Sequence, residues 1–210
     1  MIIFIPIKHL SQRIPNKNFR LFREKPLWEH TVDKFNSSCY DVFVNTDSEE
    51  IINKCGDKNV TVVRRENSLL GHEVSVVDLI KSFVLNFNIT EPICQVHVTS
   101  PFLKTSHVSL AFEKLRGGFY DSVFTANRVQ ARLWREESFG LCPVNHNPCK
   151  LEQTQDLPIY WEENSYLYAF NPDVLSYNNR IGLNPYIMEV GYPFNIDIDT
   201  EEDWKIVSNL

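Results

Sequence analysis

Residues 1–20, MIIFIPIKHLSQRIPNKNFR, open the chain with a short apolar run and continue into a basic loop. The run Met1–Ile5 has the length of one buried strand, and we expect Pro6 to end it. The loop then carries four cations between and after two prolines: Lys8, Arg13, Lys17 and Arg20. Such side chains, together with free backbone N–H groups after a strand, are typical of a polyphosphate site. The alternative is a solvated loop of mixed charge, and the glycine spacing of a P-loop or dinucleotide fingerprint is missing.

The composition predicts a single globular domain over residues 1–210. Of these residues 43% are hydrophobic and 23% charged, and the net charge of −6 argues against a nucleic-acid partner. The basic loop is therefore a local concentration that suits a small anion. No stretch has the length of a membrane span, no signal-peptide cleavage pattern is present, and the five cysteines form no Cys-x-x-Cys pair. We therefore expect a cytoplasmic protein with reduced thiols and no zinc site.

Strands and helices are predicted to alternate along the first half of the chain. The expected strands after the first are residues 42–44, 60–63 and 93–98, and the expected helices are residues 27–35, 49–55, 74–87 and 106–115. The helix that ends at Cys55 is expected to be capped by Asp47 or Ser48. This alternation indicates an α/β fold, an open, mostly parallel sheet with helices on both faces. The basic loop, Asp47, Arg65 and Thr99 should then share one rim of the sheet.

The second half is less regular. Further strands are expected at residues 121–126, 166–170 and 186–190, and a last helix should begin after Thr200 as its cap, with acidic residues in its first turn. Between the first two of these strands, Arg132–Tyr160 shows no periodicity. We predict that residues 127–163 form a hairpin or lobe that leaves the sheet and covers the site.

The most informative short motif is Asp197-Ile198-Asp199. On an extended strand, residues two apart point to the same face, so both carboxylates would project together while Ile198 points into the core. Mg²⁺ shared with phosphate oxygens is the usual partner of such a pair. The alternative is that Asp199 helps to cap the last helix and that Asp197 is solvated. Asp47 could be a third carboxylate at the metal or simply a helix cap.

Taken together, these motifs resemble the cytidylyltransferases that activate acidic sugars, of which acylneuraminate (CMP-sialic acid) synthetase is the best known. Six pieces match in order over nearly the full length: residues 5–18, Lys25-Pro26-Leu27, residues 45–49, Val63-Arg64-Arg65, Thr99-Ser100-Pro101 and residues 196–201.

The resemblance implies a nucleotide-diphospho-sugar transferase fold, CTP as donor, Mg²⁺ as cofactor and a homodimer joined through the excursion. It also implies roles for individual residues. The residues expected in catalysis are Lys8, Arg13, Lys17, Asp197 and Asp199, of which the last two would hold the metal. The residues expected around CTP are Lys8, Ser11, Gln12, Arg13, Lys17, Asn18, Arg65 and Thr99.

Several positions depart from the pattern of that family. Lys8 and Gln12 replace the usual Arg and Lys, and His72 replaces a carboxylate expected after the Arg65 motif. His97 replaces the Gln expected before the Thr-Ser-Pro turn. Where sialate enzymes place arginines for the carboxylate of the sugar, this chain has Gln153-Thr154 and Glu162. A lone carboxylate would be repelled there, whereas an ammonium would be attracted.

The chain also resembles the enzymes of capsule phosphoramidate biosynthesis that join CTP to phosphoglutamine. The block from Arg132 to Ser165 carries this likeness. We therefore favour phosphoglutamine as acceptor, giving CDP-glutamine and pyrophosphate, with a nonulosonic acid or a non-catalytic nucleotide-binding module as alternatives. The residues expected to bind the acceptor are His97, Glu162, Glu163, Asn164 and Tyr168. Glu162-Glu163 could instead be surface charge, and His146 a loop histidine.

Overall fold

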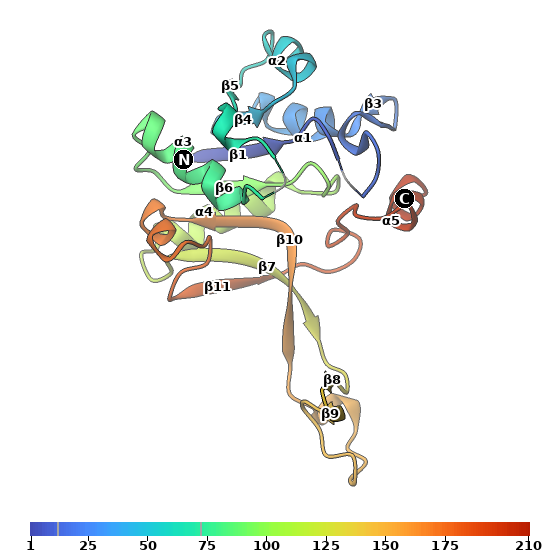
Figure 1. Cartoon of the computed structure of the whole chain (residues 1–210). Helices are drawn as coiled ribbons and strands as arrows, with labels where there is room; N and C mark the ends of the chain where they lie inside the picture. Colours follow the sequence, from blue (N-terminus) through green and yellow to red (C-terminus); the bar gives the residue numbers. More distant parts are fainter. Residues whose placement is uncertain (12, 72) are drawn as a thin grey trace.

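Strand β1 (Ile2–Ile7) lies inside a seven-stranded sheet in the computed structural model, which describes residues 1–11, 13–71 and 73–210 (Figure 1). Its side chains alternate between two apolar cores. Ile3, Ile5 and Ile7 pack on one face of the sheet, and Ile2 and Phe4 on the other. A strand buried on both faces is typical of the inside of a parallel sheet, which is why the run is apolar without alternation.

Pro6 does not end the first strand, contrary to the prediction. It lies within β1 and pairs with Asn45 of the neighbouring strand. On the other side, β1 pairs with its neighbour only over Ile2–Phe4. Beyond Phe4 that side pairs with no strand of the described residues, so the missing N–H of Pro6 removes no ladder hydrogen bond there.

The large sheet has the order β11-β7-β10-β6-β1-β4-β5. Its other strands are β4 (Asp41–Thr46), β5 (Thr61–Arg64), β6 (Ile93–Val96), β7 (Ser122–Val129), β10 (Tyr160–Phe170) and β11 (Pro185–Glu189). Strand β10 is antiparallel to β6 and β7, and the other neighbouring pairs are parallel. The prediction of a mostly parallel sheet is confirmed.

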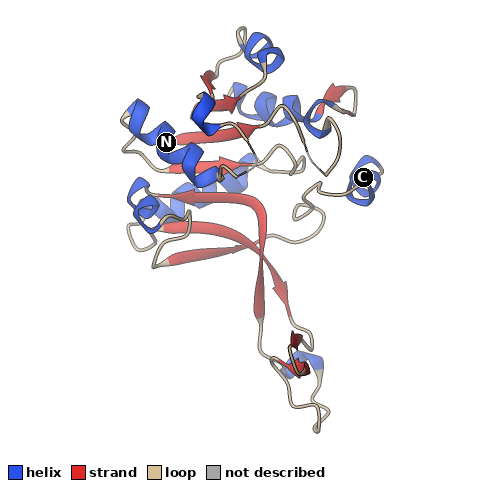
Figure 2. Ribbon diagram, in the orientation of Figure 1, coloured by secondary structure: helices blue, strands red, loops and turns tan. Residues whose placement is uncertain are grey.

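Helices cover both faces of this sheet, as predicted (Figure 2). They are α1 (Leu27–Asn36), α2 (Glu49–Cys55), α3 (Val76–Phe87), α4 (Thr105–Arg116) and α5 (Glu201–Ser208), with a 3₁₀ helix η4 (Pro172–Tyr177). The helices α1, α2 and α4 bury apolar side chains on one face, and α3 and η4 bury theirs on the other.

The helix caps follow from local sequence. Ser48 accepts a hydrogen bond from the N–H of Ile51, so Ser48 rather than Asp47 caps α2. Thr200 forms a capping box with Asp203 at the start of α5. Such caps satisfy backbone donors that the first turn of a helix leaves free. The expected start of the last helix is therefore confirmed.

A third, smaller core positions the site. Ile14 and Phe22, from the stretch after β1, pack with Ile198 and with Trp204 and Val207 of α5. This cluster joins the beginning of the chain to its end, because burial of these side chains removes apolar surface of both segments from water. The basic loop is thereby held beside the Asp197-Ile198-Asp199 segment.

An arm, residues 127–163, leaves the sheet where β7 and β10 continue together past the ends of their neighbours β6 and β11 (Figure 1). The two strands pair with each other from Tyr160–Val129 to Glu163–Ala126. At the far end, β8 (Trp134–Glu137) and β9 (Gly140–Pro143) form a hairpin. Residues 127–163 thus contain the predicted hairpin. The arm extends away from the sheet, however, and does not cover the site of its own chain.

The other differences from the prediction concern short segments of the chain. The Asp197-Ile198-Asp199 segment is an extended loop without strand pairing, although Ile198 is fully buried, as expected. The elements not predicted include η4 and a small hairpin of β2 (Leu21–Phe22) and β3 (Lys25–Pro26). The remaining short 3₁₀ helices are η1 (Lys17–Phe19), η2 (Asn67–Leu69) and η3 (Thr154–Asp156). Among the residues that the structure describes, no helix combines the length and apolarity of a membrane crossing.

The Thr99-Ser100-Pro101 turn is held by a lysine of α1. Lys34 donates to the carbonyl oxygens of Pro101 at 3.0 Å and Leu103 at 2.5 Å. Burial lowers the pKa of Lys34 to about 8. Between about pH 8 and the ordinary lysine pKa of about 10.4, Lys34 is more often protonated in the unfolded chain than in the folded one. The Lys34 contribution to the free energy of unfolding should therefore rise with pH in this window, by about 3 kcal/mol.

Lys34→Met is expected to remove this rise. The measurement is urea denaturation at pH 7.5 and pH 10 for the parent, Lys34→Met and Lys54→Met, a control that changes an exposed lysine of α2. The parent and the control should gain more stability on going to pH 10 than Lys34→Met does. Equal gains in all three proteins would contradict the assignment.

Candidate active site

A cavity of about 340 Å³ opens at the carboxyl ends of β1 and β6. Ligands of open α/β sheets bind at this edge. The residues that line it are Pro6, Lys8, Leu10, Ser11, Arg13, Lys17, Asn18, His97, Val98, Thr99, Ser165, Asp197 and Asp199. All described residues predicted for catalysis lie in this set. Gln12 and His72 lie outside the described residues.

A second cavity of about 210 Å³ adjoins the first. Pro6, Lys8 and His97 line both, and Arg65 and Gly71 line the second. The predicted common rim of the basic loop, Asp47, Arg65 and Thr99 is therefore confirmed, with Asp47 bonded to the loop at His9 rather than lining a cavity.

Backbone and amide contacts shape the basic loop. The side-chain amide of Asn18 donates to the carbonyl oxygen of Lys8 at 2.7 Å, and Nζ of Lys8 donates to the carbonyl oxygen of Gly71 at 2.8 Å. The N–H of His9 donates to Oδ1 of Asp47 at 2.7 Å. Asp47 therefore anchors the loop to the end of β4 and does not line the cavity, so neither of its two predicted roles matches this position.

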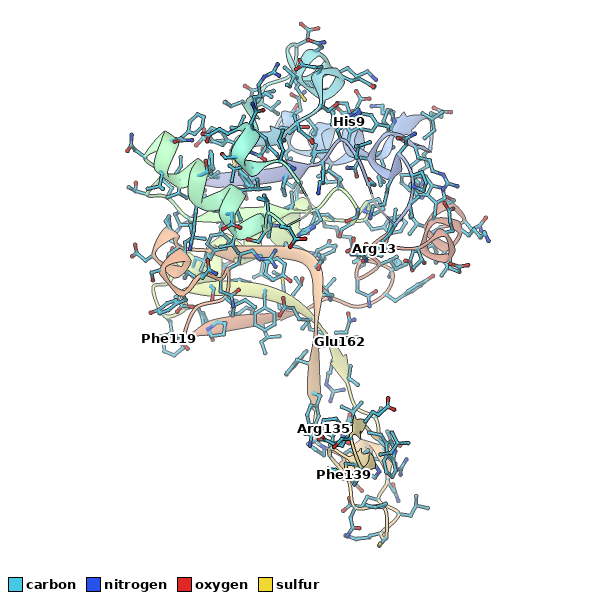
Figure 3. The ribbon with its side chains drawn as sticks, viewed as in Figure 1. His9, Arg13, Phe119, Arg135, Phe139 and Glu162 are labelled. Atoms are coloured by element: carbon cyan, nitrogen blue, oxygen red, sulfur yellow. The ribbon has the colours of Figure 1, made fainter. Side chains whose placement is uncertain are left out.

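Two cations of the loop meet Asp199. Arg13 forms an ion pair with the Asp199 carboxylate, and its own side chain remains 69% exposed. Lys17 is only 12% exposed; its Nζ donates to the carbonyl oxygen of Ile198 at 2.6 Å and lies 3.3 Å from Oδ1 of Asp199. Figure 3 shows Arg13 on the side of the molecule where the C-terminal segment lies. Residues about 180 positions apart thus form one charged cluster.

Asp197 lies beside this cluster in a different environment. Its Oδ1 atom is buried and has no hydrogen-bond partner among the described residues. Burial raises the pKa of the Asp197 carboxyl, and the charge of Asp199 raises it further. The backbone between the two carboxylates is tied to the turn after β6, because the N–H of Ile198 donates to the carbonyl oxygen of Thr99 at 2.9 Å.

The carboxylate pair can hold a hard cation. Among the described residues no group of three or more His, Cys, Asp or Glu side chains forms a metal site. Two carboxylates nevertheless fit Mg²⁺, which usually takes one or two protein carboxylates and completes its shell with phosphate and water. The unpartnered, buried Oδ1 of Asp197 is the atom that such an ion would satisfy.

Arg65 is held in place from β4. Its Nε donates to Oδ1 of Asn45 at 2.7 Å, and burial lowers the pKa of its guanidinium. It faces the second cavity together with Lys8. A positively charged group is thus fixed at the wall next to the basic loop.

Of the residues predicted to bind the acceptor, His97 lines the cavity and the other four lie along β10 outside the lining. Glu162 accepts a hydrogen bond from Asn127 at the root of the arm (Figure 3). Glu163 accepts one from the hydroxyl of Tyr168. Asn164 donates to Asn127 at 2.9 Å. Their assignment to the acceptor remains a prediction.

Sequence reasoning missed three residues near this site. Ser165 lines the cavity, and Arg180 and Gln95 form hydrogen bonds behind it. Arg180 lies in an irregular segment after η4, where no periodicity signals a role. His146, by contrast, packs against Trp134 in the arm, as expected of a loop histidine.

The sequence is similar to several enzymes over nearly its whole length. It is 28% identical to the CMP-N,N'-diacetyllegionaminic acid synthase of Legionella pneumophila and 30% identical to the pseudaminic acid cytidylyltransferase of Campylobacter jejuni; each match covers 100% of this chain and 95% of the relative. It is 25% identical to an N-acylneuraminate cytidylyltransferase of Streptococcus agalactiae over 97% of this chain. The chain spans about half, 51%, of the length of that relative.

The fold is also similar to that of solved structures. A CMP:2-keto-3-deoxy-manno-octonic acid synthetase complexed with CTP superposes with a TM-score of 0.70 at 15% identity, covering 99% of this chain and 96% of the other. A 4-diphosphocytidyl-2C-methyl-D-erythritol synthase superposes with a TM-score of 0.68 at 15% identity, covering 99% and 97%. The expected nucleotide-diphospho-sugar transferase-like fold is confirmed.

The family follows from a match along almost the entire chain. The family model described as cytidylyltransferase matches residues 2–204, which include the basic loop, both cavities and the two carboxylates. The chain belongs to the cytidylyltransferase family.

Proposed function

We propose that this protein transfers a cytidylyl group from CTP to a small anionic acceptor, with release of pyrophosphate. The observation that carries the proposal is the meeting of Lys8, Arg13 and Lys17 with Asp197 and Asp199 in one cavity. Clustered cations suit a triphosphate, and paired carboxylates suit the metal ion that accompanies it. A non-catalytic nucleotide-binding module has no need for both carboxylates.

In the proposed reaction an oxygen of the acceptor attacks the α-phosphorus of CTP. A phosphate oxygen attacks as the anion, whereas a hydroxyl oxygen loses its proton to water as it attacks. A new P–O bond forms while the bond to the β-phosphate oxygen breaks, and pyrophosphate leaves. Lys8, Arg13 and Lys17 would lie along the triphosphate and balance its charge, and the carbonyl of Ile198 fixes the direction of Lys17. Asp197 and Asp199 would hold Mg²⁺, which when bound neutralises charge on phosphate oxygens.

Other predicted residues support nucleotide binding. Ser11, Asn18 and Thr99 line the first cavity, and Arg65 lines the second. These groups offer hydroxyl, amide and guanidinium donors to the oxygens of a nucleotide. Since the two cavities adjoin, CTP would occupy one and reach into the other.

For the acceptor, we propose a nonulosonic acid as the first candidate, because two relatives of nearly the same length are named for legionaminic and pseudaminic acid. Phosphoglutamine is the second candidate; the departures that suggested it, Thr154 and Glu162, lie in the arm and outside the cavity lining of their own chain. A phosphate acceptor is already a nucleophile at neutral pH, so it needs no general base. Either product would serve the biosynthesis of a surface polysaccharide.

The experiment is to incubate the protein with CTP, Mg²⁺ and each candidate acceptor, to measure pyrophosphate and to weigh the product. We expect release that depends on CTP, and a turnover with UTP at least about tenfold lower, because a pocket that pairs the cytosine amino group leaves polar groups unmatched with uracil. Equal turnover with UTP would contradict the base preference. CTP binding without pyrophosphate release from any acceptor would favour the non-catalytic module.

We also propose that the arm joins two copies of the chain. Apolar side chains are exposed along it, with Phe139 at 80%, Leu141 at 68% and Leu151 at 91%. Exposed apolar groups concentrated on a protruding segment are typical of an interface with a second chain. A homodimer would bury them.

The oligomer prediction is tested with charge substitutions. Light scattering should give a dimer for the parent and a monomer for the double variant Phe139→Asp/Leu141→Asp. Leu85→Asp is the matched control, because Leu85 is 75% exposed on α3, away from the arm. A monomeric parent, or a double variant that stays dimeric, would contradict the role of the arm.

A further inference from the structure

A chain of polar side chains runs from β10 to the cavity. The hydroxyl of Tyr168 donates to Glu163, and the guanidinium of Arg180 lies 3.6 Å from the centre of the Tyr168 ring. Arg180 then donates to Oε1 of Gln95 at 2.9 Å. The last link joins Nε2 of Gln95 to Nε2 of His97 at 2.7 Å.

The direction of each hydrogen bond follows from Arg180. A guanidinium only donates, so the Gln95 atom that faces it must be the amide oxygen. The amide nitrogen of Gln95 therefore faces His97, and because an amide NH₂ only donates, Nε2 of His97 must accept. A histidine that accepts at Nε2 is neutral and carries its proton on Nδ1.

The electrostatics agree with a neutral ring. The hydrogen bond comes from a fully buried side chain, Gln95. The burial of His97 itself lowers its pKa to about 4. The charges of Arg180 and Lys17 lower this pKa further, and the charge of Asp199 opposes them. The guanidinium of Arg180 is itself largely removed from water, and burial lowers its pKa.

The remaining ring nitrogen of His97 is the one that a ligand can use. His97 lines both cavities. Nδ1 has no hydrogen-bond partner in the part of the chain that the structure describes. An N–H group at this point suits an oxygen that carries negative charge.

We propose that Arg180, acting through Gln95, holds His97 in the neutral Nδ1–H tautomer, and that His97 donates this hydrogen to a carboxylate or phosphate oxygen of the acceptor. Arg180 and Gln95 are thus positioning residues, and His97 determines specificity. The role toward the acceptor rests on the proposed function, whereas the tautomer depends only on the described contacts.

The tautomer is tested by long-range ¹H–¹⁵N correlation spectra of the full chain at pH 7, with the His97 signals identified by their loss in His97→Gln. We expect Nδ1–H in the parent. Gln95→Glu keeps the shape but replaces the donating NH₂ with an acceptor oxygen, so Nε2 of His97 should become protonated. Arg180→Met should give a mixture of tautomers, and Arg180→Lys should restore the parent state.

Two spectroscopic outcomes would overturn the positioning role. One is an Nε2–H tautomer in the parent. The other is a Gln95→Glu spectrum identical to that of the parent. If Arg180→Met fails to fold, Gln95→Glu still tests the positioning role. This variant retains the packing and gives Arg180 an anionic partner.

The contact with the acceptor is tested by steady-state kinetics with N-acetylneuraminate and with phosphoglutamine. His97→Gln reaches toward Gln95 but has no donor at the Nδ1 position, so KM for the acceptor should rise about tenfold, clearly more than KM for CTP. His97→Asn places an amide where Nδ1 lies and should recover most of the loss. Equal KM values in all three proteins would overturn this contact.

The tautomer of His97 and its contact with the acceptor can be contradicted independently of each other. A parent without turnover on N-acetylneuraminate, legionaminic acid, pseudaminic acid or phosphoglutamine contradicts the proposed function and with it the contact from His97. The spectra then still decide whether Arg180 sets the tautomer. Turnover on one acceptor with unchanged KM in His97→Gln would instead retain the function and remove only the contact.

Discussion

Asp197→Asn should lower turnover by about a thousandfold while the protein stays folded. The amide keeps the size of the side chain but removes the charge that would hold the metal beside the phosphates. Burial raises the pKa of the Asp197 carboxyl. At pH values above the ordinary pKa of an aspartate, the ionised side chain therefore lowers the stability of the folded protein. Removing that charge should leave the melting temperature in chelator unchanged or slightly higher. Loss of activity without loss of stability is the signature of a functional carboxylate.

The measurements are pyrophosphate release at saturating CTP and Mg²⁺, and melting with chelator or with CTP and Mg²⁺. The parent should be stabilised by CTP and Mg²⁺ more than Asp197→Asn is. Asp57→Asn is the matched control, since Asp57 is an exposed aspartate far from the cavity lining. Turnover of Asp197→Asn within about tenfold of the parent would remove Asp197 from the proposed metal site.

Lys17→Met should lower turnover by about a hundredfold and also destabilise the fold. Lys17 is nearly buried and joins the basic loop to the Ile198 carbonyl and to Asp199. Its loss removes a cation from the triphosphate and leaves the carbonyl of Ile198 without this donor, a change expected to cost about 1–3 kcal/mol of unfolding free energy. Unlike Asp197→Asn, this variant should lose both properties.

The controls for Lys17 separate charge from anchoring. Lys17→Arg keeps the charge and should recover part of the activity. Lys25→Met removes an exposed lysine paired with Asp33 and should change turnover by less than about twofold. Normal turnover in Lys17→Met, measured by pyrophosphate release, would show that the triphosphate does not depend on this cation.

Much of the fold could be predicted because its signals are local. The apolar run of β1 needs burial on both faces, so it predicts an inner strand. The cap at Thr200 with its acidic partners marks the start of α5, since Thr200 satisfies a backbone donor within one turn. The cap at Ser75 was not predicted, and the helix expected from residue 74 begins at Val76. The order of the strands in the sheet could not be read locally, because it depends on contacts between distant segments.

Boundaries were predicted less well for the same reason. Pro6 is a strand breaker by its local chemistry, yet it lies inside β1 because the pairing to β6 ends before it. Strand β10 begins at Tyr160, well before the predicted residue 166, because its partner β7 also continues past the sheet edge. The pairing with neighbouring strands decides where such a strand begins and ends, and this pairing cannot be read from the local sequence of the strand.

By itself, the sequence determined the chemistry at the two ends of the chain: the cations after the first strand and the carboxylates before the last helix. Their residue types predict a phosphate and metal site wherever they lie. Only the tertiary structure decided that Lys17 and Asp199 meet, because the core of Ile14, Ile198 and Trp204 brings the two ends together. Arg180 emerged from the structure alone, since its role depends on Gln95, 85 positions away in the chain. Packing between distant segments makes such contacts, and local sequence carries no record of them.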